Sequence, residues 1–243
     1  MNESYSMNHT VHQFQQLIAS YTGKLLREHF GKGPESVLVS IGGRYITIYL
    51  RNFLASSERI LLQQEHVMII NQMRDKLMQM VNPEIIGYIH QLTGVKPSEI
   101  YYDWALHNQS GMITIICPDY LDQELELRED YYGKEELERA VLLISQQAQK
   151  PPEQLYSCEM NNRILLFVRE GILVPIEKEF IRLGHGELLK EVKRNLDKNL
   201  LCNCEGFELI LNRPVLDVFV DWNYELDKSI IVIVTGNPKT TKS

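Results

Sequence analysis

The stretches YYDWALHNQSGMITIIC at residues 101–117 and FVDWNYELDKSIIVIVT at residues 219–235 contain both tryptophans of the chain. In each stretch the tryptophan follows an aspartate and precedes an apolar run of strand length. The recurrence indicates either a functional motif used twice or a structural unit present in two copies.

The rest of the chain supports a duplication. At an offset of 118 residues, the identical pairs are Pro34 and Pro152, Ile46 and Ile164, Arg51 and Arg169, Asp103 and Asp221, and Trp104 and Trp222. With one extra residue in the second half, the further pairs are Glu58 and Glu177, His66 and His185, Arg74 and Lys193, and Leu77 and Leu196. A match sustained along most of each half predicts two copies of one domain.

We place repeat 1 at residues 1–118, an acidic connector at 119–133 and a diverged repeat 2 at 134–243. Two copies of this size do not form a solenoid, which needs several short repeats in series. They are typical of a fused pseudo-dimer with an approximate twofold axis. The organisation also leaves room for a further homo-oligomer.

Each repeat is predicted to have the element order α-β-β-α-α-β-β. In repeat 1 these elements are a helix at residues 12–30, a hairpin turning at Gly42-Gly43, helices from about residue 56 with a break or kink at Asn82-Pro83, and a hairpin of residues 100–106 and 112–117. In repeat 2 they are a helix at 135–147, a hairpin at 155–169, helices at 176–207 and a hairpin at 215–235. The predicted fold class is α+β, with antiparallel sheets faced by helices on one side.

The second helical region of repeat 1 shows apolar residues at helical spacing. Ile70, Met73, Leu77 and either Met80 or Val81 form one predicted apolar stripe,.

Charge and hydropathy argue against several classes of protein. A formal charge of −7 disfavours nucleic acid as the main partner,. No apolar run approaches the ~20 residues that a membrane-spanning helix needs. The N-terminal MNESYSMNHT lacks the basic and then apolar layout of a signal peptide,. We therefore expect a cytoplasmic protein that does not itself span a membrane.

Much of the negative charge lies in one stretch. Residues 118–140 contain nine acidic residues and three basic ones. We interpret the stretch as a solvated connector that runs into an exposed helix face, and the alternative is a docking surface for a basic partner.

Motifs for cofactors and metals are not recognisable. The thiols of Cys202 and Cys204 form a C-x-C pair, but the two further ligands of a zinc site are not found at suitable spacing,. The segment Gly31-Lys32-Gly33 lacks the preceding strand and the further glycine of a dinucleotide-binding loop, and no P-loop, G-x-S-x-G or H-E-x-x-H motif occurs,. We expect reduced thiols, no metal and no cofactor.

The Asp-Trp pair lies in a predicted strand, so its two side chains point to opposite faces of the sheet. The tryptophan shares the apolar face in both repeats, as a core anchor or at a surface where the repeats meet, and ligand stacking is the alternative. For Asp103 and Asp221, we expect a structural ion pair, with Arg51 and Arg169 as the candidate partners.

The recurring polar residues form the one set that resembles a site. They are Arg51, Glu58, His66 and Arg74, with Arg169, Glu177, His185 and Lys193. Residues spaced by eight do not align on one unbroken helix, so the set converges only if the helix breaks near His66. A general-base histidine supported by a glutamate is one interpretation, and a helix-stabilising first-turn Glu58 is the other.

The segment GKGPESVLVSIGGRYITIYLRNFLASSERIL resembles the opening of the small bacterial MpsC family. The family pattern is a helix, a G-x-G-P turn, a hairpin and a step into a second helix. Gly31, Gly33, Pro34, Leu54 and Glu58 match it, whereas Ala55 replaces the family's threonine. LTGVKPSEIYYDWALH resembles a later segment of the family. Repeat 2 lacks both glycines of the turn and is a diverged copy.

The resemblance implies an association with a cation-translocating, membrane-potential-generating system that is tied to the uptake of inorganic carbon. It implies an accessory or regulatory subunit, with no catalytic residues to transfer. We therefore favour a non-enzymatic interaction protein that docks on a membrane transport complex. The alternative is a small-ligand-binding or enzymatic domain with its site between the repeats.

Overall fold

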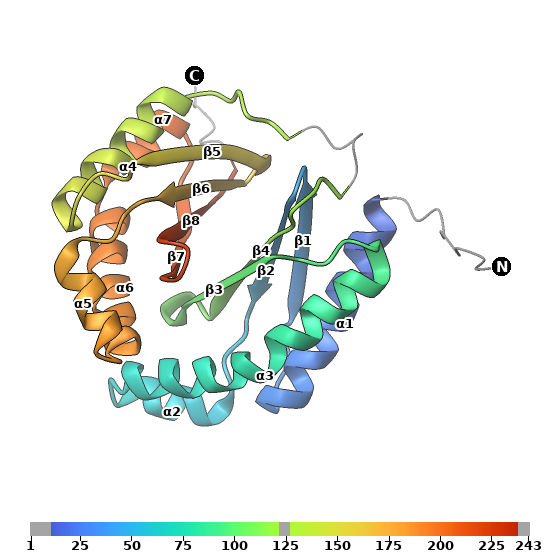
Figure 1. Cartoon of the computed structure of the whole chain (residues 1–243). Helices are drawn as coiled ribbons and strands as arrows, with labels where there is room; N and C mark the ends of the chain where they lie inside the picture. The colour runs from blue at the N-terminus through green and yellow to red at the C-terminus, as the bar shows by residue number, and fades with distance from the viewer. Residues whose placement is uncertain (1–10, 122–126, 238–243) are drawn as a thin grey trace, which may run out of the picture. The chain divides into compact units, whose positions relative to one another are not determined.

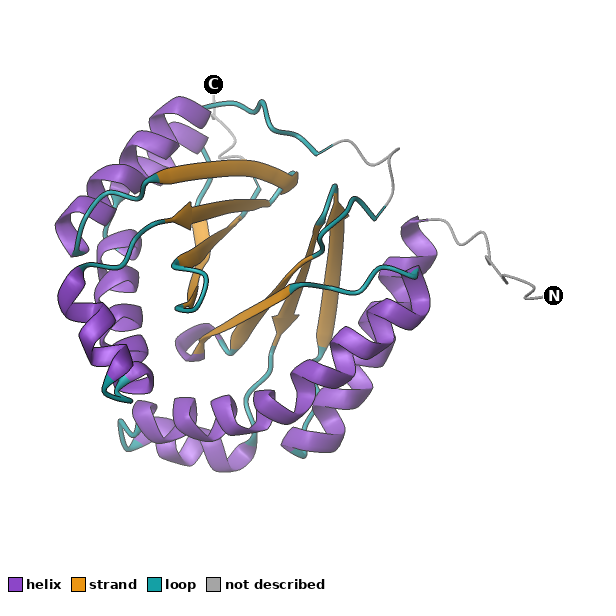
Figure 2. Ribbon diagram, viewed as in Figure 1, coloured by secondary structure: helices purple, strands orange, loops and turns teal. Residues whose placement is uncertain are grey.

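The computed structural model describes residues 11–121 and 127–237. These residues form two four-stranded antiparallel sheets together with helices. Figure 2 shows the strands and the helices in separate colours. The strand order is β1-β2-β4-β3 in the first sheet and β5-β6-β8-β7 in the second. The same order in both halves confirms the predicted α+β fold of two repeats.

The elements of the first repeat are α1 (Val11–Phe30), β1 (Ser36–Gly42), β2 (Tyr45–Arg51), α2 (Ser56–Gln63), α3 (Val67–Thr93), β3 (Glu99–Ala105), a 3-10 turn (Leu106–Asn108) and β4 (Ser110–Ile116). Those of the second are α4 (Lys134–Ala148), β5 (Gln154–Asn161), β6 (Ile164–Glu170), α5 (Pro175–Arg182), α6 (Gly186–Cys202), α7 (Glu205–Leu211), β7 (Val215–Asn223) and β8 (Lys228–Thr235). Each predicted helix and hairpin is present within a few residues of its expected bounds.

Contacts divide the chain into two compact units. Of the described residues, the first unit contains 11–99 and 115–121, and the second contains 100–114 and 127–237. Most of β3 and β4 is therefore grouped with the elements of repeat 2.

In the first unit, α1 packs against β1 and α3, and Figure 1 shows the two long helices side by side. The rings of Tyr21 and Tyr88 stack between these helices, with centroids 3.9 Å apart and planes within 7°. The sequence predicts a break or a kink at Asn82-Pro83, and helix α3 continues through Pro83, so a break is wrong. Its contacts with α1 and α2 offset the loss of the backbone hydrogen bond at the proline,.

The predicted apolar stripe of α3 is wrong at Met73, and of the two alternatives for its last position Val81 is confirmed over Met80. Ile70 and Val81 are buried, but Met73 is 37 % exposed and Met80 is 59 % exposed. Arg74 occupies the inward position beside Ile70, where its side chain is completely buried. Hydrophobicity alone favours burial of methionine over arginine. Here arginine is the buried residue, because it forms an ion pair inside the unit.

In the second unit, helices α4, α6 and α7 cover one face of the sheet. The core between them contains Phe167 of β6, Val220 and Trp222 of β7, and Ile231 of β8. Figure 1 shows α4 and α6 along this face. Side chains of the opposite face, such as Val232, are equally buried. Trp222 thus has the apolar-face position that its sequence pattern predicted.

Candidate functional site

Glu58 and Arg74 form a buried ion pair in the first unit. The helical region is interrupted between α2 and α3. This interruption brings Glu58 and Arg74 together, whereas one continuous helix would hold them apart. Arg74 Nε donates to Glu58 Oε1 at 2.7 Å, and Nη2 donates to Oε2 at 2.8 Å. Nη2 also donates to the backbone oxygen of Phe53 at 2.9 Å, and the guanidinium lies 4.9 Å from the Phe53 ring centroid. The fork geometry of arginine matches the carboxylate at both oxygens.

The same carboxylate also stabilises the start of α2. Glu58 Oε2 accepts a hydrogen bond from the backbone N–H of Ala55 at 2.7 Å, as in one half of a capping box,. Glu58 therefore has the first-turn role that the sequence allowed. Because both of its oxygens accept bonds from Arg74 or Ala55, it is not placed to support a histidine as a general base.

The second unit repeats this arrangement with lysine in place of arginine. Lys193 Nζ lies 2.6 Å from Glu177 Oε1, and Glu177 Oε2 accepts from the backbone N–H of Val174 at 3.0 Å. Lys193 also donates to the side chain of Gln149 and lies 5.8 Å from the Trp222 ring centroid. Burial lowers the pKa of Lys193, and the neighbouring Glu177 opposes that shift.

The two recurring histidines lie apart from these pairs. His66 and His185 each precede the first residue of a helix, α3 and α6 respectively, and both side chains are exposed. Their positions correspond to the tight turn between the two helices of each repeat. The structure thus brings together Glu58 with Arg74 and Glu177 with Lys193, and leaves both histidines outside.

The two recurring arginines differ between the repeats. Arg51 is exposed at the end of β2. Arg169 is fully buried, and its Nη2 donates to Asp197 of α6 at 2.7 Å. Arg169 also donates to the hydroxyl oxygens of Ser229 and Ser145. The expected pairing of Arg169 with the strand aspartate Asp221 is therefore wrong, because Asp197 of α6 forms the ion pair with Arg169.

Asp103 and Asp221 each accept a hydrogen bond from the backbone of the other aspartate's strand. The N–H of Val220 donates to Asp103 Oδ2 at 2.9 Å, and the N–H of Tyr102 donates to Asp221 Oδ2 at 2.8 Å. The two contacts are reciprocal, so β3 and β7 are related by a local twofold in this part of the second unit. The Asp-Trp recurrence therefore reflects a structural contact that needs an aspartate on both strands.

Basic residues of α6 neutralise the two aspartates. Arg194 Nε lies 3.2 Å and Lys198 Nζ 2.6 Å from Asp103, and Lys190 Nζ lies 2.6 Å from Asp221. Lys198 also donates to the backbone oxygen of Trp104 at 2.6 Å. Sequence reasoning missed these three cations, although their spacing of four residues on one helix was a usable signal.

The remaining repeat markers have structural positions. Trp104 and Trp222 are 3 % and 5 % exposed, which leaves little surface for stacking on a ligand. Pro34 is buried and Pro152 half-buried, each just before the first strand of its repeat.

A groove of about 530 Å³ lies in the second unit beside the end of α6. Its wall includes His107, Cys202, Cys204 and the carboxylates Glu208 and Asp217. Burial raises the pKa of Cys202, which makes its thiolate less available at neutral pH,. No group of three or more His, Cys, Asp or Glu side chains suited to a metal ion occurs within residues 11–121 and 127–237.

The carboxylates of this groove are engaged in the fold. Asp217 accepts hydrogen bonds from Asn108 and Ser110, each at 2.8 Å. Glu208 accepts from the backbone N–H of Val215 at 2.9 Å. These bonds stabilise the turn that joins β3 to β4 and the start of β7, so neither carboxylate is a free base.

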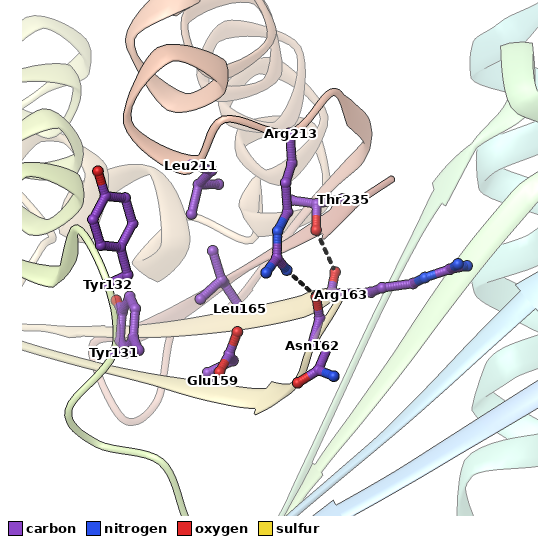
Figure 3. Close-up of a pocket in the computed structure, with 9 residues that line it drawn as sticks. All are labelled: Tyr131, Tyr132, Glu159, Asn162, Arg163, Leu165, Leu211, Arg213 and Thr235. Atoms are coloured by element: carbon purple, nitrogen blue, oxygen red, sulfur yellow. Dashed lines mark hydrogen bonds between the residues drawn. The ribbon is translucent and has the colours of Figure 1, made fainter. Parts of the chain in front are cut away.

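A smaller cavity of about 40 Å³ lies at the turn between β5 and β6 (Figure 3). Arg213 donates to the backbone oxygen of Asn162, and the Thr235 hydroxyl donates to the backbone oxygen of Arg163. The volume suits about one water molecule, so this cavity belongs to the turn.

None of the helices within the described residues combines the length and the apolar character needed to cross a bilayer. Comparison with curated proteins and with solved structures gives no match. A family model described as Na+-translocating membrane potential-generating system (MpsC) matches residues 10–118 and again residues 135–237. These two segments cover most of the chain and follow its two repeats. The chain belongs to the MpsC family, with two tandem copies of the family domain.

Proposed function

We propose that the chain is a non-enzymatic accessory subunit that docks on the membrane part of a cation-translocating system. The observation that carries this proposal is the use of the recurring polar residues inside the fold. Glu58 with Arg74, and Glu177 with Lys193, form buried ion pairs and cap their helices. An enzyme that used this set would need at least one of these groups free to exchange a proton with substrate.

The family match supports a cation-translocating membrane system as the partner. Its description names a Na+-translocating, membrane-potential-generating system, and such a system needs a component that spans the membrane. Because no helix within the described residues is suited to span a bilayer, this chain would act as a peripheral component of the system, at the cytoplasmic face.

Co-purification tests the proposal. The tagged chain is incubated with detergent-solubilised membranes that contain the membrane subunits of a Na+-translocating, membrane-potential-generating system, and retained subunits are quantified. We expect retention of at least one membrane subunit by the wild-type chain. A matched variant, His66→Ala with His185→Ala, should retain the same amount, because both histidines are exposed and outside the ion pairs. Loss of retention in this variant, or no retention by the wild type, would contradict the proposal.

A further inference from the structure

Exposed apolar residues recur at equivalent positions of the two repeats. On α3, the side chains are Ile69 (49 % exposed), Met73 (37 %) and the half-buried Leu77. On α6, the aligned side chains are Leu188 (52 %), Val192 (56 %) and Leu196 (42 %). We call these two sets the α3 stripe and the α6 stripe. Each has the spacing i, i+4, i+8, so its members form one ridge along the helix.

Packing of the core does not explain why these exposed apolar residues recur in both repeats. Core residues recur in two copies because both cores need them, but exposed positions are free to diverge to polar residues. The exposed face of α4 shows this ordinary pattern, with Glu135, Glu136 and Arg139 around a single exposed Leu143. Diverged copies that both keep an apolar ridge in water therefore retain it for a contact with another molecule.

The charge around the stripes indicates the kind of partner. Lys76 is the single exposed charged side chain of α3 between Val67 and Met80, and Glu187 is the single one on α6. An uncharged ridge is complementary to an uncharged apolar surface and offers nothing to anionic headgroups or phosphates. The partner face is therefore apolar and nearly neutral.

The size of each stripe favours a single helix over a second copy of the chain. Three partly exposed side chains and their neighbours present a patch on the order of a few hundred Å². A stable dimer buries about 800 Å² on each partner, which is more than one stripe supplies. One amphipathic helix laid along the ridge matches both the area and the spacing, because i±4 ridges pack into the grooves of another helix.

We propose that the α3 stripe and the α6 stripe each bind the apolar face of one partner helix, so that one chain binds two similar helices. This inference rests on the proposed function, in which the partner is a membrane complex that presents these helices. Burial of one stripe removes three apolar side chains from water, which favours binding. Two stripes on one chain then raise the overall affinity through multivalency.

The probe for the test is a synthetic helical peptide with leucines at i, i+4 and i+8 and with glutamine and alanine elsewhere. Binding is measured by isothermal titration calorimetry against the full chain. The α3 variant is Ile69→Gln with Met73→Gln, and the α6 variant is Leu188→Gln with Val192→Gln. The matched control is Leu143→Gln on α4, which is equally exposed but outside both stripes. Because all five positions are exposed, circular dichroism should show that every variant folds.

We expect two peptides bound per wild-type chain, one per chain in either stripe variant, and at least a tenfold loss of affinity when both are combined. The control should bind as the wild type does. Equal binding by the combined variant and the control would overturn the inference. So would a wild-type dimer in sedimentation that the stripe variants convert to monomers, because the occupant would then be a second copy.

Membrane co-purification separates this inference from the proposed function. If the combined variant still retains the membrane subunits, docking stands but the stripes do not perform it. If the peptide binds both stripes and no membrane subunit is retained, the stripes bind helices and the proposed partner is wrong.

Discussion

Both repeats contain a buried ion pair between a glutamate and a cation, but the cation differs between them. In the first, Arg74 binds Glu58 through two parallel hydrogen bonds and lies against Phe53. In the second, Lys193 makes one short contact to Glu177 and lies beside Trp222. A planar guanidinium matches both carboxylate oxygens, whereas an ammonium acts as a point charge. Both repeats thus have a glutamate and a cation at this position of the fold, and the cation can be either arginine or lysine.

Removing the arginine should give the largest effect. Arg74→Ala leaves the Glu58 carboxylate buried without a cation, and we expect a loss of about 3–5 kcal/mol in the free energy of unfolding. Urea denaturation followed by circular dichroism measures this loss. Arg74→Lys should lose only about 1–2 kcal/mol, because the charge stays but one of the parallel bonds goes. Equal losses in the two variants would contradict the assigned geometry.

The strand aspartates allow a second comparison. Asp103 forms ion pairs with Arg194 and Lys198, whereas Asp221 forms one with Lys190. We expect Asp103→Ala to cost about 3 kcal/mol, because the buried Arg194 keeps only its longer contact to Glu191, at 3.4 Å,. Asp221→Ala should cost about 1 kcal/mol, because the partly exposed Lys190 side chain can turn toward water,. Urea denaturation of both variants tests the order, and a larger loss for Asp221→Ala would contradict it.

Alkaline pH should distinguish Lys193 from Arg74. Burial lowers the pKa of Lys193 in the folded state, so between that pKa and 10.5 the unfolded chain binds more protons at this residue. This group therefore makes the free energy of unfolding rise with pH in that window. Lys193→Met should lack this contribution, so its stability relative to wild type should fall as pH rises from 8 to 10.5. Thermal denaturation across that range measures the difference, and a constant difference would contradict the lowered pKa.

The smallest expected effect concerns the turn between the two helices. Glu65 has a φ of 60° where the second repeat has Gly184 with a φ of 84°. A left-handed conformation is unfavourable for a residue with a Cβ, so Glu65→Gly should stabilise the chain by at most about 1 kcal/mol. Gly184→Glu should destabilise it by a similar amount. Denaturation midpoints of the two variants test this, and a stabilising Gly184→Glu would contradict the comparison.

The sequence predicted the repeats, the hairpins and the apolar position of Trp222, because these follow from local patterns and from the internal alignment. It did not predict that Arg74 would be buried in place of Met73. That choice depends on Glu58, which lies on another helix, and hydrophobic periodicity does not report such a partner. Nor did it predict the cations that reach Asp103, because Arg194 and Lys198 lie far along the chain, in the other repeat.

The recurring polar residues stabilise the fold, and we propose that the α3 stripe and the α6 stripe contact the partner. The most direct measurement is the amount of membrane subunit that co-purifies with two variants, each compared with wild type. We predict that His66→Ala with His185→Ala retains the wild-type amount, and that the combined stripe variant, with Ile69, Met73, Leu188 and Val192 each changed to glutamine, retains little. The reverse result, with retention lost in the histidine variant and kept in the stripe variant, would contradict the account.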